Sequence, residues 1–598
     1  MPTRQRQIRC RLSGEEDKPP AEQCMARTDR HLPTWFRAAD SVKGKGYPMK
    51  NVLEYLEQTA ERFPEKRAVT DPEGSLTFAG LLEKARKAGT YLARYTSPGQ
   101  PVGIYMSKSK DAYAAMLGIV YAGCFSVFLN TEQGTLRLRK MVETSGLSIV
   151  LTDRPGEAAQ TFCPEEDDRA GTGCAESGGV QTGDAESECA EPGCARSSGT
   201  SRARLQFLDT AEAFSTEVDR AALDAVRVHQ TDTDPLYCNF TSGSTGTPKG
   251  VLVSHRSVID FMNYFPELFH ITKDDVIGNQ APFDFDVSVK DIYSSLKTGA
   301  ELVLIPRKYF TVITNLMDYL DEKKVTTLTW AVSALCLVVQ FRGFTYKVPS
   351  SIRRVLFSGE VMPERFLRAW MEQYPDAEFV NLYGPSEITC NCTYYRVQGP
   401  AEDLSGKPLP IGVPFPNEKV FLLDEKGRRI TESGRSGEIC VSGSCLALGY
   451  LNAPEATRKA FCPSPLETRF PEQMYRTGDL GYYREDGQLC FSGRADFQIK
   501  LFGHRIELEE VEGALNTAHG VERGFCVFNR EKNRLEACYC GQAEPRALKG
   551  ELLKLLPQYM VPSRFHHVQE IPLTDHGKMD RRRVLEQLGE GAKEEHKV

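Results

Sequence analysis

The segment richest in groups that could do chemistry is "NFTSGSTGTPKGV", Asn239 to Val251, which follows the apolar run "PLYC". Its glycines leave backbone N–H groups bare, its hydroxyls can donate hydrogen bonds, and Lys249 adds a cation, a combination suited to phosphate oxygens. Composition alone leaves a Gly- and Ser-rich turn open as the alternative. The loop is not a Walker A motif, because Lys249 precedes Gly250 and no Ser or Thr follows at the magnesium position. It therefore predicts a phosphate site of another kind.

Such a loop needs a scaffold, and the surrounding chain alternates short apolar runs with helical periodicity. We expect helices over residues 52–63, 81–95 and 111–122. We expect strands over residues 67–70, 102–106 and 125–129. The alternation resumes after Leu205 and runs to about Arg354. This order predicts an α/β fold with a parallel sheet that helices cover on both faces.

Four segments depart from this pattern. Residues 1–48 read as a leader of uncertain order, and residues 412–493, rich in turn residues, predict a small β-rich lobe. Residues 155–204 are crowded with Gly, Ala, Glu, Ser and Cys, which predicts a solvated low-complexity insertion; a metal site or redox clasp on its cysteines is the less favoured alternative. Residues 498–586 look like a separate α+β unit, with a break near Asp496.

Composition limits the function classes. The 598 residues are 40% hydrophobic and 26% charged, as in globular proteins, and the net charge of -7 argues against a general nucleic-acid binder. No apolar run reaches the roughly 20 residues of a membrane span, and the first 40 residues hold no signal-like stretch, so we expect a cytoplasmic location. The 18 cysteines read as reduced thiols, and their spacing makes a zinc site unlikely.

Six motifs in a fixed order carry a family resemblance. The phosphate loop is followed by "NLYGPSE" (381–387), "GEICVSGSCLALGYL" (437–451), "YRTGDLG" (475–481), "GRADFQIKLFGHRIELEEVE" (493–512) and "IPLTDHGKMDRR" (571–582). Together they resemble the adenylate-forming superfamily of acyl-CoA synthetases, luciferases and nonribosomal peptide synthetase adenylation domains. The resemblance spans most of residues 49–582, outside the leader and the insertion.

The resemblance implies a domain plan. Residues 49–495 would form a large N-terminal adenylation core of two α/β sheet lobes and the small β-rich lobe. Residues 496–588 would form a smaller, mobile α+β C-terminal domain that acts as an AMP-binding lid, followed by a tail at 589–598.

The resemblance also implies how ATP would be held. Its phosphates would contact Thr241, Ser242, Gly243, Thr245, Gly246 and Lys249. Tyr383 would stack on adenine, Asp479 would accept hydrogen bonds from the ribose hydroxyls, and Arg494 would lie near the nucleotide. Glu387 would hold Mg²⁺, a role that suits a carboxylate. The implied cofactors are therefore ATP and Mg²⁺.

Three residues of the C-terminal part would serve the two half-reactions. Lys578 would bridge the substrate carboxylate and the α-phosphate, which cancels their repulsion. Asp496 would be the hinge on which the lid turns, and Gly503 in "KLFGHR" would let the backbone approach a pantetheine arm. Taken singly, a solvated lysine and ordinary turn residues are the alternatives.

The substrate clue is "APFDFDVSVKDIYSSLKTGAELVL", residues 281–304, which looks like the segment where an aspartate pairs with the α-ammonium of an amino acid. Asp286 matches that position, and its alternative is a helix cap. This segment and "LFSGEVMP" (356–363) look especially like D-alanine to carrier-protein ligases and stand-alone peptide-synthetase adenylation domains. The remaining implied pocket residues are Val287, Lys290, Leu356, Ser358, Leu382, Cys390 and Asn391.

Lys290 departs from a pocket for alanine. A cation facing the substrate side chain would favour an acidic or polar amino acid, and the alternative is that Lys290 points into solvent. The chirality and identity of the amino acid therefore stay open.

The expected reaction is activation of an amino acid as its adenylate and transfer to a thiol. Only 20 residues follow Lys578, too few for a carrier domain, so we expect the acceptor to be a separate phosphopantetheinylated carrier protein or coenzyme A. The alternatives are an acyl- or aryl-CoA ligase, in which Asp286 would have no ammonium partner, and a non-catalytic nucleotide-binding homologue.

Overall fold

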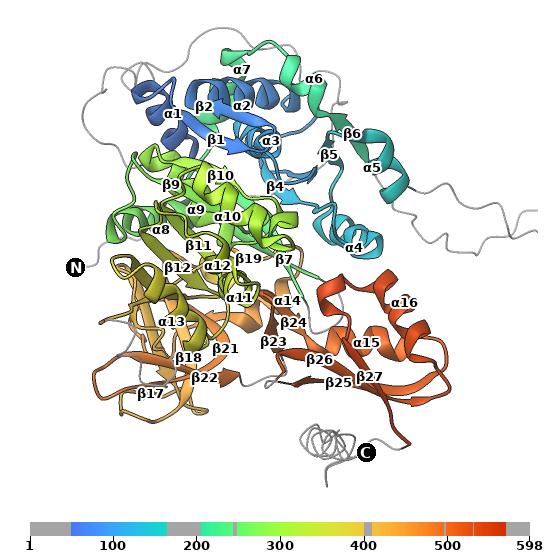
Figure 1. Ribbon diagram of the computed structural model, residues 1–598. Coiled ribbons are helices and arrows are strands. Elements are labelled where there is room, and N and C mark those ends of the chain that lie inside the picture. The colour runs from blue at the N-terminus through green and yellow to red at the C-terminus, as the bar shows by residue number, and fades with distance from the viewer. Residues whose placement is uncertain are drawn as a thin grey trace, which may run out of the picture. The chain divides into compact units, whose positions relative to one another are not determined.

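The computed structural model describes residues 49–163, 205–242, 248–399, 409–494, 498–529 and 532–569. Within these ranges the chain is a mixed α/β protein with two large sheets, a smaller β lobe and a C-terminal α+β part (Figure 1). The expected fold class is confirmed.

The first sheet has nine strands within the described residues. Its order is β15 (Val413–Pro414), β14 (Thr393–Arg396), β13 (Glu378–Tyr383), β12 (Arg354–Ser358), β11 (Thr327–Ala331), β9 (Val276–Asn279), β10 (Glu301–Leu304), β1 (Arg67–Asp71) and β2 (Gly74–Thr77). The six strands from β13 to β1 run parallel, and the strands at both edges are antiparallel.

The second sheet has seven described strands. Its order is β19 (Gly449–Tyr450), β8 (Lys249–Ser254), β7 (Pro235–Thr241), β4 (Phe125–Phe128), β3 (Pro101–Tyr105), β5 (Ile149–Thr152) and β6 (Gln206–Asp209). The strands from β7 to β6 are parallel, whereas β8 turns back antiparallel to β7 across the expected phosphate loop. The loop therefore connects two neighbouring strands of one sheet.

Helices lie between the two large sheets and on their outer faces. Those between the sheets are α1 (Leu53–Arg62), α2 (Phe78–Leu92), α3 (Lys110–Tyr121), α8 (His255–Leu268) and α9 (Val287–Thr298), and they share one apolar core with both sheets. The nine-stranded sheet is covered on its other face by α10 (Ile313–Glu322), α11 (Val332–Gln340), α12 (Gly343–Tyr346) and α13 (Glu364–Gln373). Around the seven-stranded sheet lie α4 (Thr135–Ser145), α5 (Pro155–Phe162), α6 (Thr210–Ser215) and α7 (Arg220–His229). Burial on both faces explains why the parallel strands are nearly continuous apolar runs.

The β-rich lobe is a six-stranded antiparallel sheet. It contains β16 (Glu418–Leu423), β17 (Arg429–Ile430), β18 (Gly437–Gly443), β20 (Phe461–Pro463), β21 (Gln473–Tyr483) and β22 (Leu489–Arg494), with α14 (Pro454–Ala460) before β20. Its core also includes Tyr383, the last residue of β13 in the first sheet, and Ile388, which comes soon after β13. This shared core fixes the lobe against the carboxyl end of β13.

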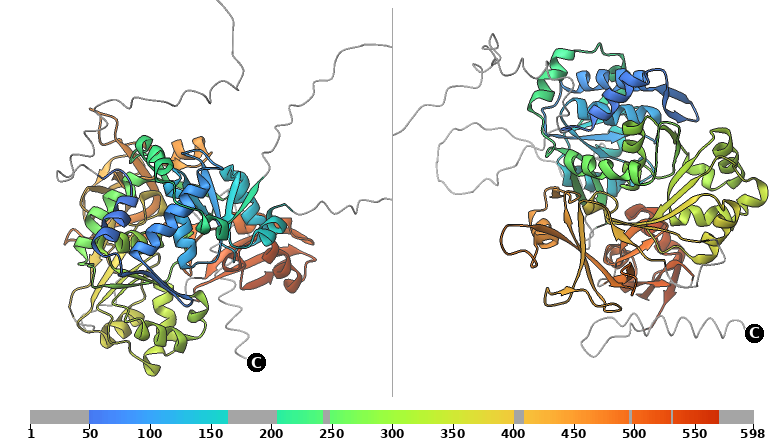
Figure 2. Two further views of the ribbon diagram at one scale, coloured as in Figure 1. Left: turned by 90° about the horizontal axis from the view of Figure 1, so that it is seen from above. Right: turned by 90° about the vertical axis from the view of Figure 1, so that its left-hand side faces the viewer.

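The C-terminal part has its own core. The hairpin β23 (Gln498–Leu501) and β24 (His504–Glu507) leads into α15 (Leu508–Thr517), and α15 and α16 (Pro545–Leu555) pack on the sheet β25 (Val521–Asn529), β26 (Arg534–Gly541) and β27 (Arg564–His567). Figures 1 and 2 show these elements, in red, grouped together in every view.

The start of the expected insertion differs from the prediction. Residues 155–162 form α5, and Phe162 packs edge-on against Tyr105 and is stacked with Phe207, because these aromatic side chains bury one another. Residues 164–204, the leader 1–48, the expected domain boundary at 495–496 and the tail lie outside the described residues.

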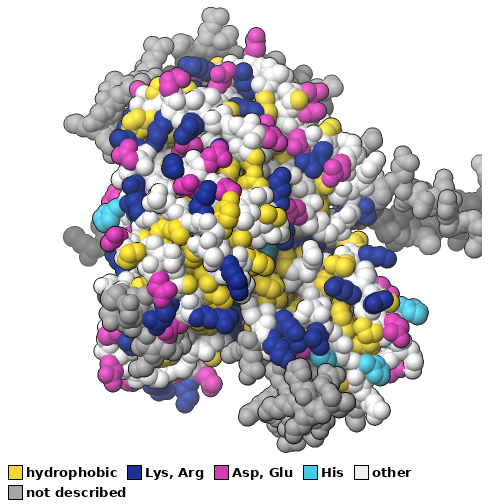
Figure 3. All heavy atoms as spheres, viewed as in Figure 1, with side chains coloured by type: hydrophobic (Ala, Val, Ile, Leu, Met, Phe, Trp, Pro, Cys, Tyr) yellow, Lys and Arg dark blue, Asp and Glu magenta, His cyan; other side chains and the backbone are white. Residues whose placement is uncertain are grey.

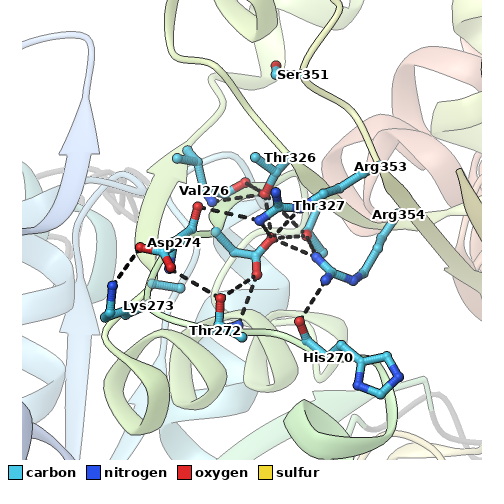
Figure 4. A network of polar contacts seen from close by, with 12 residues as sticks. His270, Thr272, Lys273, Asp274, Val276, Thr326, Thr327, Ser351, Arg353 and Arg354 are labelled. Atoms are coloured by element: carbon cyan, nitrogen blue, oxygen red, sulfur yellow. Dashed lines mark hydrogen bonds and ion pairs between the residues drawn. The ribbon is translucent and has the colours of Figure 1, made fainter.

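One buried carboxylate joins the amino ends of three parallel strands. Asp275, just before β9, accepts hydrogen bonds from Arg353 Nη2 at 2.8 Å, Arg354 Nη1 at 2.6 Å and the Thr326 hydroxyl at 2.7 Å. Burial raises its pKa, but the backbone N–H of Thr272 and these donors outweigh burial and hold the pKa below its usual range. Figure 4 shows Thr326, Arg353 and Arg354 converging in this network. The network holds together the amino ends of β9, β11 and β12, whereas the expected site lies at their carboxyl ends.

The surface carries both signs of charge. On the face drawn in Figure 3, Lys and Arg side chains are interspersed with Asp and Glu over the upper half. Among the described helices, none is both long enough and apolar enough to span a lipid bilayer.

Candidate active site

The expected site residues gather around one cavity at the carboxyl ends of the parallel strands. It lies beside the ends of β7, β12 and β13, the start of α9, and strands β21 and β22, and the hairpin β23–β24 closes one side. Its lining includes Asn239, Thr241, Ser242, Asp284, Asp286, Val287, Ser358, Ser386, Cys390, Asn391, Asp479, Arg494, Gln498, Lys500, Gly503 and Arg505. This edge of an open α/β sheet is where ligands generally bind.

Asp286 lines the cavity at the start of α9. It occupies the N-cap position of α9, yet its side chain makes no capping hydrogen bond to the described backbone. Burial raises the pKa of its carboxyl group, and a hydrogen bond from the Ser386 side chain and the nearby Lys290 ammonium oppose this rise. A carboxylate that is not used to cap the helix, in a cavity that disfavours its charge, can accept an ammonium ion from a ligand.

Lys290 lies one turn further along α9 and is fully buried. Its Nζ donates hydrogen bonds to Asn391 Oδ1 at 3.0 Å and to Ser358 Oγ at 3.3 Å. The alternative that Lys290 points into solvent is therefore wrong. The ammonium group lies directly behind two residues that line the cavity.

The other expected pocket residues fall into two groups. Val287, Ser358, Cys390 and Asn391 line the cavity, and burial raises the pKa of the Cys390 thiol to about 12, so this cysteine stays protonated near neutral pH. Leu356 in β12 and Leu382 in β13 are buried in the core of the nine-stranded sheet and do not line the cavity. Their side chains can shape the pocket only from behind.

Two residues of the expected phosphate loop are part of the cavity wall. Thr241 ends β7 and Ser242 follows it, and both line the cavity. Lys249 begins β8, with its Nζ 5.7 Å from the ring centre of Tyr450. Gly243, Thr245 and Gly246 lie outside the described residues. The two strands thus hold both ends of the loop at the cavity.

Tyr383, Asp479 and Arg494 form a connected group. The Tyr383 hydroxyl donates to Asp479 Oδ2 at 2.6 Å, and Arg494 makes an ion pair with the other carboxylate oxygen. Asp479 and Arg494 face each other across the β21–β22 pair. The β-rich lobe therefore presents one carboxylate and one guanidinium group to the cavity.

Glu387 is buried behind the cavity in the short 3₁₀ helix Ser386–Ile388. Its carboxylate accepts two hydrogen bonds from Arg505 Nη1, at 2.9 and 3.0 Å, and one from the Tyr450 hydroxyl at 2.8 Å. Burial raises the pKa of Glu387, but Arg505 and Tyr450 outweigh burial and hold it below its usual range. The Glu387 carboxylate is therefore charged, and it forms an ion pair with Arg505 of the β23–β24 hairpin.

The hairpin β23–β24 reaches into the site from the C-terminal part. Its turn residues Phe502 and Gly503 both have positive φ, at 53° and 78°, as in the tight turns that favour glycine. The Gly503 N–H donates to Glu360 Oε1 at 2.7 Å, and a Cβ on Gly503 would lie 3.2 Å from the Cβ of Ala331. The Arg505 carbonyl accepts a hydrogen bond from Ser242 Oγ at 2.8 Å. The turn and the second strand of the hairpin thus contact the core.

His504 packs between two aromatic rings. It is stacked on Tyr559 at 3.5 Å between ring centres and meets Phe285 edge-on at 4.8 Å. Burial, together with the charges of Arg307 and Arg137, lowers its pKa to about 3. The imidazole is therefore neutral where the hairpin is seated.

Several lining residues were not predicted individually, among them Lys500 and Arg505. Both lie in the "KLFGHR" region, where the alternation along the hairpin could have indicated which side chains face inward. Burial lowers the pKa of Lys500. Arg137, whose Nη1 pairs with Glu510 of α15 at 3.0 Å, carried no recognisable signal because its partner is 373 residues away. Lys578 and Asp496 lie outside the described residues.

Comparisons with known proteins show the family to which the chain is similar. Residues 56–451 match the sequence model of a family described as AMP-binding enzyme. Zwittermicin A synthase ZmaJ of Bacillus cereus is 30% identical over 550 residues, which cover 90% of this chain and 95% of that protein. A D-alanine–D-alanyl carrier protein ligase of Bacillus cytotoxicus is 29% identical over 549 residues, which cover 90% of this chain and 99% of that protein.

Some relatives are much longer. The match to tyrocidine synthase 3 of Brevibacillus parabrevis, 30% identical, covers 88% of this chain but 7% of that protein. Among solved structures, the Vibrio cholerae adenylation domain AlmE, in complex with glycyl-adenosine-5'-phosphate, superposes with a TM-score of 0.72 at 21% identity, over 92% of this chain and 99% of that one. This likeness supports the fold.

Proposed function

The chain belongs to the AMP-binding enzyme family, and from this premise we propose that it is a ligase that uses ATP to activate an amino acid and then passes the acyl group to a thiol. In the first step a carboxylate oxygen attacks the α-phosphorus of ATP and pyrophosphate leaves. In the second step the thiol attacks the activated carbonyl and AMP leaves. Both steps depend mainly on positioning and on neutralising charge.

The observation that carries the amino-acid assignment is Asp286. Its carboxylate lines the cavity without capping α9 within the described backbone, and burial raises its pKa. Binding an α-ammonium would pair this buried charge, whereas an acid without an amine would leave it uncompensated. The ZmaJ and D-alanine ligase relatives support the same assignment.

The opposite end of the cavity would hold the nucleotide. Thr241, Ser242 and Lys249, together with the loop residues Gly243, Thr245 and Gly246, would contact its phosphates. Asp479 would accept hydrogen bonds from the ribose, and Tyr383 and Arg494 would lie against the base and ribose. The Tyr383 hydroxyl donates a hydrogen bond to Asp479 at 2.6 Å, and Arg494 forms an ion pair with it. The Asp479 carboxylate is therefore already oriented for this role.

We also propose that Glu387 holds Mg²⁺ when ATP is bound. Within the described residues no cluster of three or more His, Cys, Asp or Glu side chains could bind a metal alone. A single carboxylate nevertheless fits, because Mg²⁺ usually takes one or two protein carboxylates together with substrate phosphates and water. The ion would supply charge neutralisation at the phosphates.

The Glu387–Arg505 pair separates the two half-reactions. While Arg505 occupies the carboxylate and the Ser242 hydroxyl bonds to the hairpin, both groups are withdrawn from ATP. We therefore assign the described arrangement to thiol transfer, with Gly503 beside the path of the thiol. Adenylation would require the C-terminal part to turn at Asp496 and present Lys578 to the carboxylate and α-phosphate.

The acceptor is proposed to be the phosphopantetheine thiol of a separate carrier protein. The carrier protein ligase among the relatives supports this choice, and coenzyme A carries the same thiol arm. A direct comparison of the two acceptors with preformed adenylate would distinguish them.

The proposal is tested by exchange of labelled pyrophosphate into ATP, with the full chain, the L- and D-amino acids and a panel of acids that lack an amine. Strong exchange with an amino acid is the expected result. Exchange only with amine-free acids would identify an acyl- or aryl-CoA ligase and overturn the role of Asp286. Absence of exchange in a folded, ATP-binding preparation would favour a non-catalytic nucleotide-binding protein.

A further inference from the structure

Lys290 is a buried cation whose hydrogen bonds go to neutral oxygens. Its side chain has 0% exposure, its Nζ contacts Asn391 Oδ1 and Ser358 Oγ, and within the described residues it makes no ion pair. A buried ammonium group without a counter-ion is costly, so its presence beside a ligand cavity requires an explanation.

The two nearest carboxylates have other partners or another role. Asp291, the next residue on α9, accepts hydrogen bonds from Asn279 Nδ2 at 2.9 Å and from the Thr329 hydroxyl, and burial raises its pKa to about 6. The positive charges of Lys290 and Lys108 both attract the Asp291 carboxylate. Asp286 lines the cavity and is the proposed partner of the α-ammonium. Within the described residues neither carboxylate makes a hydrogen bond or an ion pair with the Lys290 ammonium group, whose hydrogen bonds go to Ser358 and Asn391.

The cavity wall in front of Lys290 is rich in hydrogen-bond donors. Asn391 Oδ1 accepts from Lys290 Nζ and from Cys390 Sγ at 3.3 Å, which leaves the amide Nδ2 as the polar group that can face the cavity. Ser358 adds a hydroxyl that can donate once its oxygen accepts from Lys290. Donors backed by a positive charge recognise an anionic acceptor.

The spacing of Asp286 and Lys290 along α9 would allow a single ligand to contact both charges. Asp286 and Lys290 are four residues apart, so they lie on the same face of the helix, with Cβ atoms about 5–6 Å apart. One end of this face attracts a cation and the other an anion. A compact α-amino acid with an anionic side chain presents both charges at this scale.

We infer that the amino acid activated by this site has a side-chain carboxylate, as in aspartate or glutamate, and that Lys290 selects it. This inference rests on the proposed function. The α-ammonium pairs with Asp286, the α-carboxylate faces the nucleotide, and the side-chain carboxylate meets Asn391 and Ser358 in front of Lys290. A neutral side chain leaves the buried cation without a direct ion pair and binds more weakly.

The test is pyrophosphate exchange with aspartate, glutamate, asparagine, glutamine, alanine and leucine in both chiralities. We expect an acidic amino acid to exceed its own amide at least ten-fold in kcat/KM. In Lys290→Met, which keeps the length of the side chain without its charge, this preference falls at least ten-fold, and neutral amino acids gain relative to acidic ones. Lys297→Met, on the same helix but partly exposed, is the matched control and keeps the preference.

The outcomes separate this inference from the function on which it rests. Strong exchange with a neutral amino acid, with acidic ones inactive, would overturn the acidic pocket and leave amino-acid activation standing. An unchanged acid preference in folded Lys290→Met would overturn the role of Lys290. Exchange only with amine-free acids would overturn the proposed function itself. The wild-type ranking decides the substrate class even where the variant does not fold.

Discussion

The two ends of the candidate site are built differently. The substrate end belongs to the core: Asp286 and Lys290 lie on one helix, and Ser358 and Asn391 follow neighbouring strands of one sheet. The nucleotide end is completed by a hairpin from the C-terminal part, which makes polar contacts with Ser242, Glu360 and Glu387 of the core. Substitutions at the first end should change which acid is activated, and those at the second should change which half-reaction proceeds.

The largest effect is expected at the substrate end. Asp286→Asn removes a buried charge partner, which costs about 3–5 kcal/mol, so kcat/KM for the amino acid should fall on the order of a thousand-fold. Pyrophosphate exchange measures this loss, and Asp224→Asn, exposed on α7, is the control. Activity within three-fold of wild type would contradict the assignment of Asp286.

Substitutions in the β23–β24 hairpin should slow the transfer of the acyl group to the thiol. Arg505→Gln breaks a partly buried ion pair with Glu387, worth about 2 kcal/mol, between the values for exposed and buried pairs. Transfer from preformed adenylate to pantetheine should slow about 30-fold, with pyrophosphate exchange nearly unchanged.

Lys578→Ala should give the reverse pattern, with slow adenylation and normal transfer, because Lys578 is proposed to serve only the first step. If both variants lose the same half-reaction, the assignment of Arg505 and Lys578 to different half-reactions is wrong.

A smaller effect is expected from Gly503→Ala. The left-handed backbone and the close Ala331 contact disfavour a side chain here, by about 1–2 kcal/mol for the backbone alone, so transfer should slow about ten-fold. Gly513→Ala in α15, where an added Cβ meets no atom within 4 Å, is the control and should leave transfer unchanged. Equal transfer rates in the two variants would show that the hairpin does not seat as described.

The smallest effect is a pH dependence of hairpin seating. The pKa of His504 is lowered to about 3 in the seated hairpin, whereas an exposed histidine titrates near 6.5, so seating is favoured above pH 6.5 and weakened as the pH falls below it. Transfer should therefore fall about four-fold from pH 8 to pH 6. His504→Gln should flatten this profile, and His519→Gln should not. A profile unchanged by His504→Gln would exclude this histidine as the cause.

The local elements were largely predictable from sequence. The helices and strands expected between residues 52 and 129 correspond to α1, β1, α2, β3, α3 and β4, because their apolar periodicity reflects burial. The helix α5 was missed because a single aromatic residue, Phe162, anchors it in a sequence of otherwise low complexity. The sheet order could not be predicted, since it depends on pairings between distant segments such as β1 with β10.

The site was predictable through motifs and less so through geometry. The resemblance directed attention to Asp286, Ser358 and Asn391, which the structure brings to one cavity. It did not indicate that Lys290 would turn inward or that Leu356 and Leu382 would lie behind the wall, because these depend on side-chain packing. The Arg505–Glu387 contact joins residues 118 apart and had no local signal.

The most direct test of the central claim is a single-turnover reaction with ATP labelled at the α-phosphate, the best amino acid from the exchange panel and pantetheine. Amino-acid adenylation followed by thiol transfer predicts amino-acid-dependent formation of an aminoacyl-adenylate, and then one AMP released for each thioester formed. Release of ADP in place of AMP, or AMP formation that does not depend on the amino acid, would contradict it.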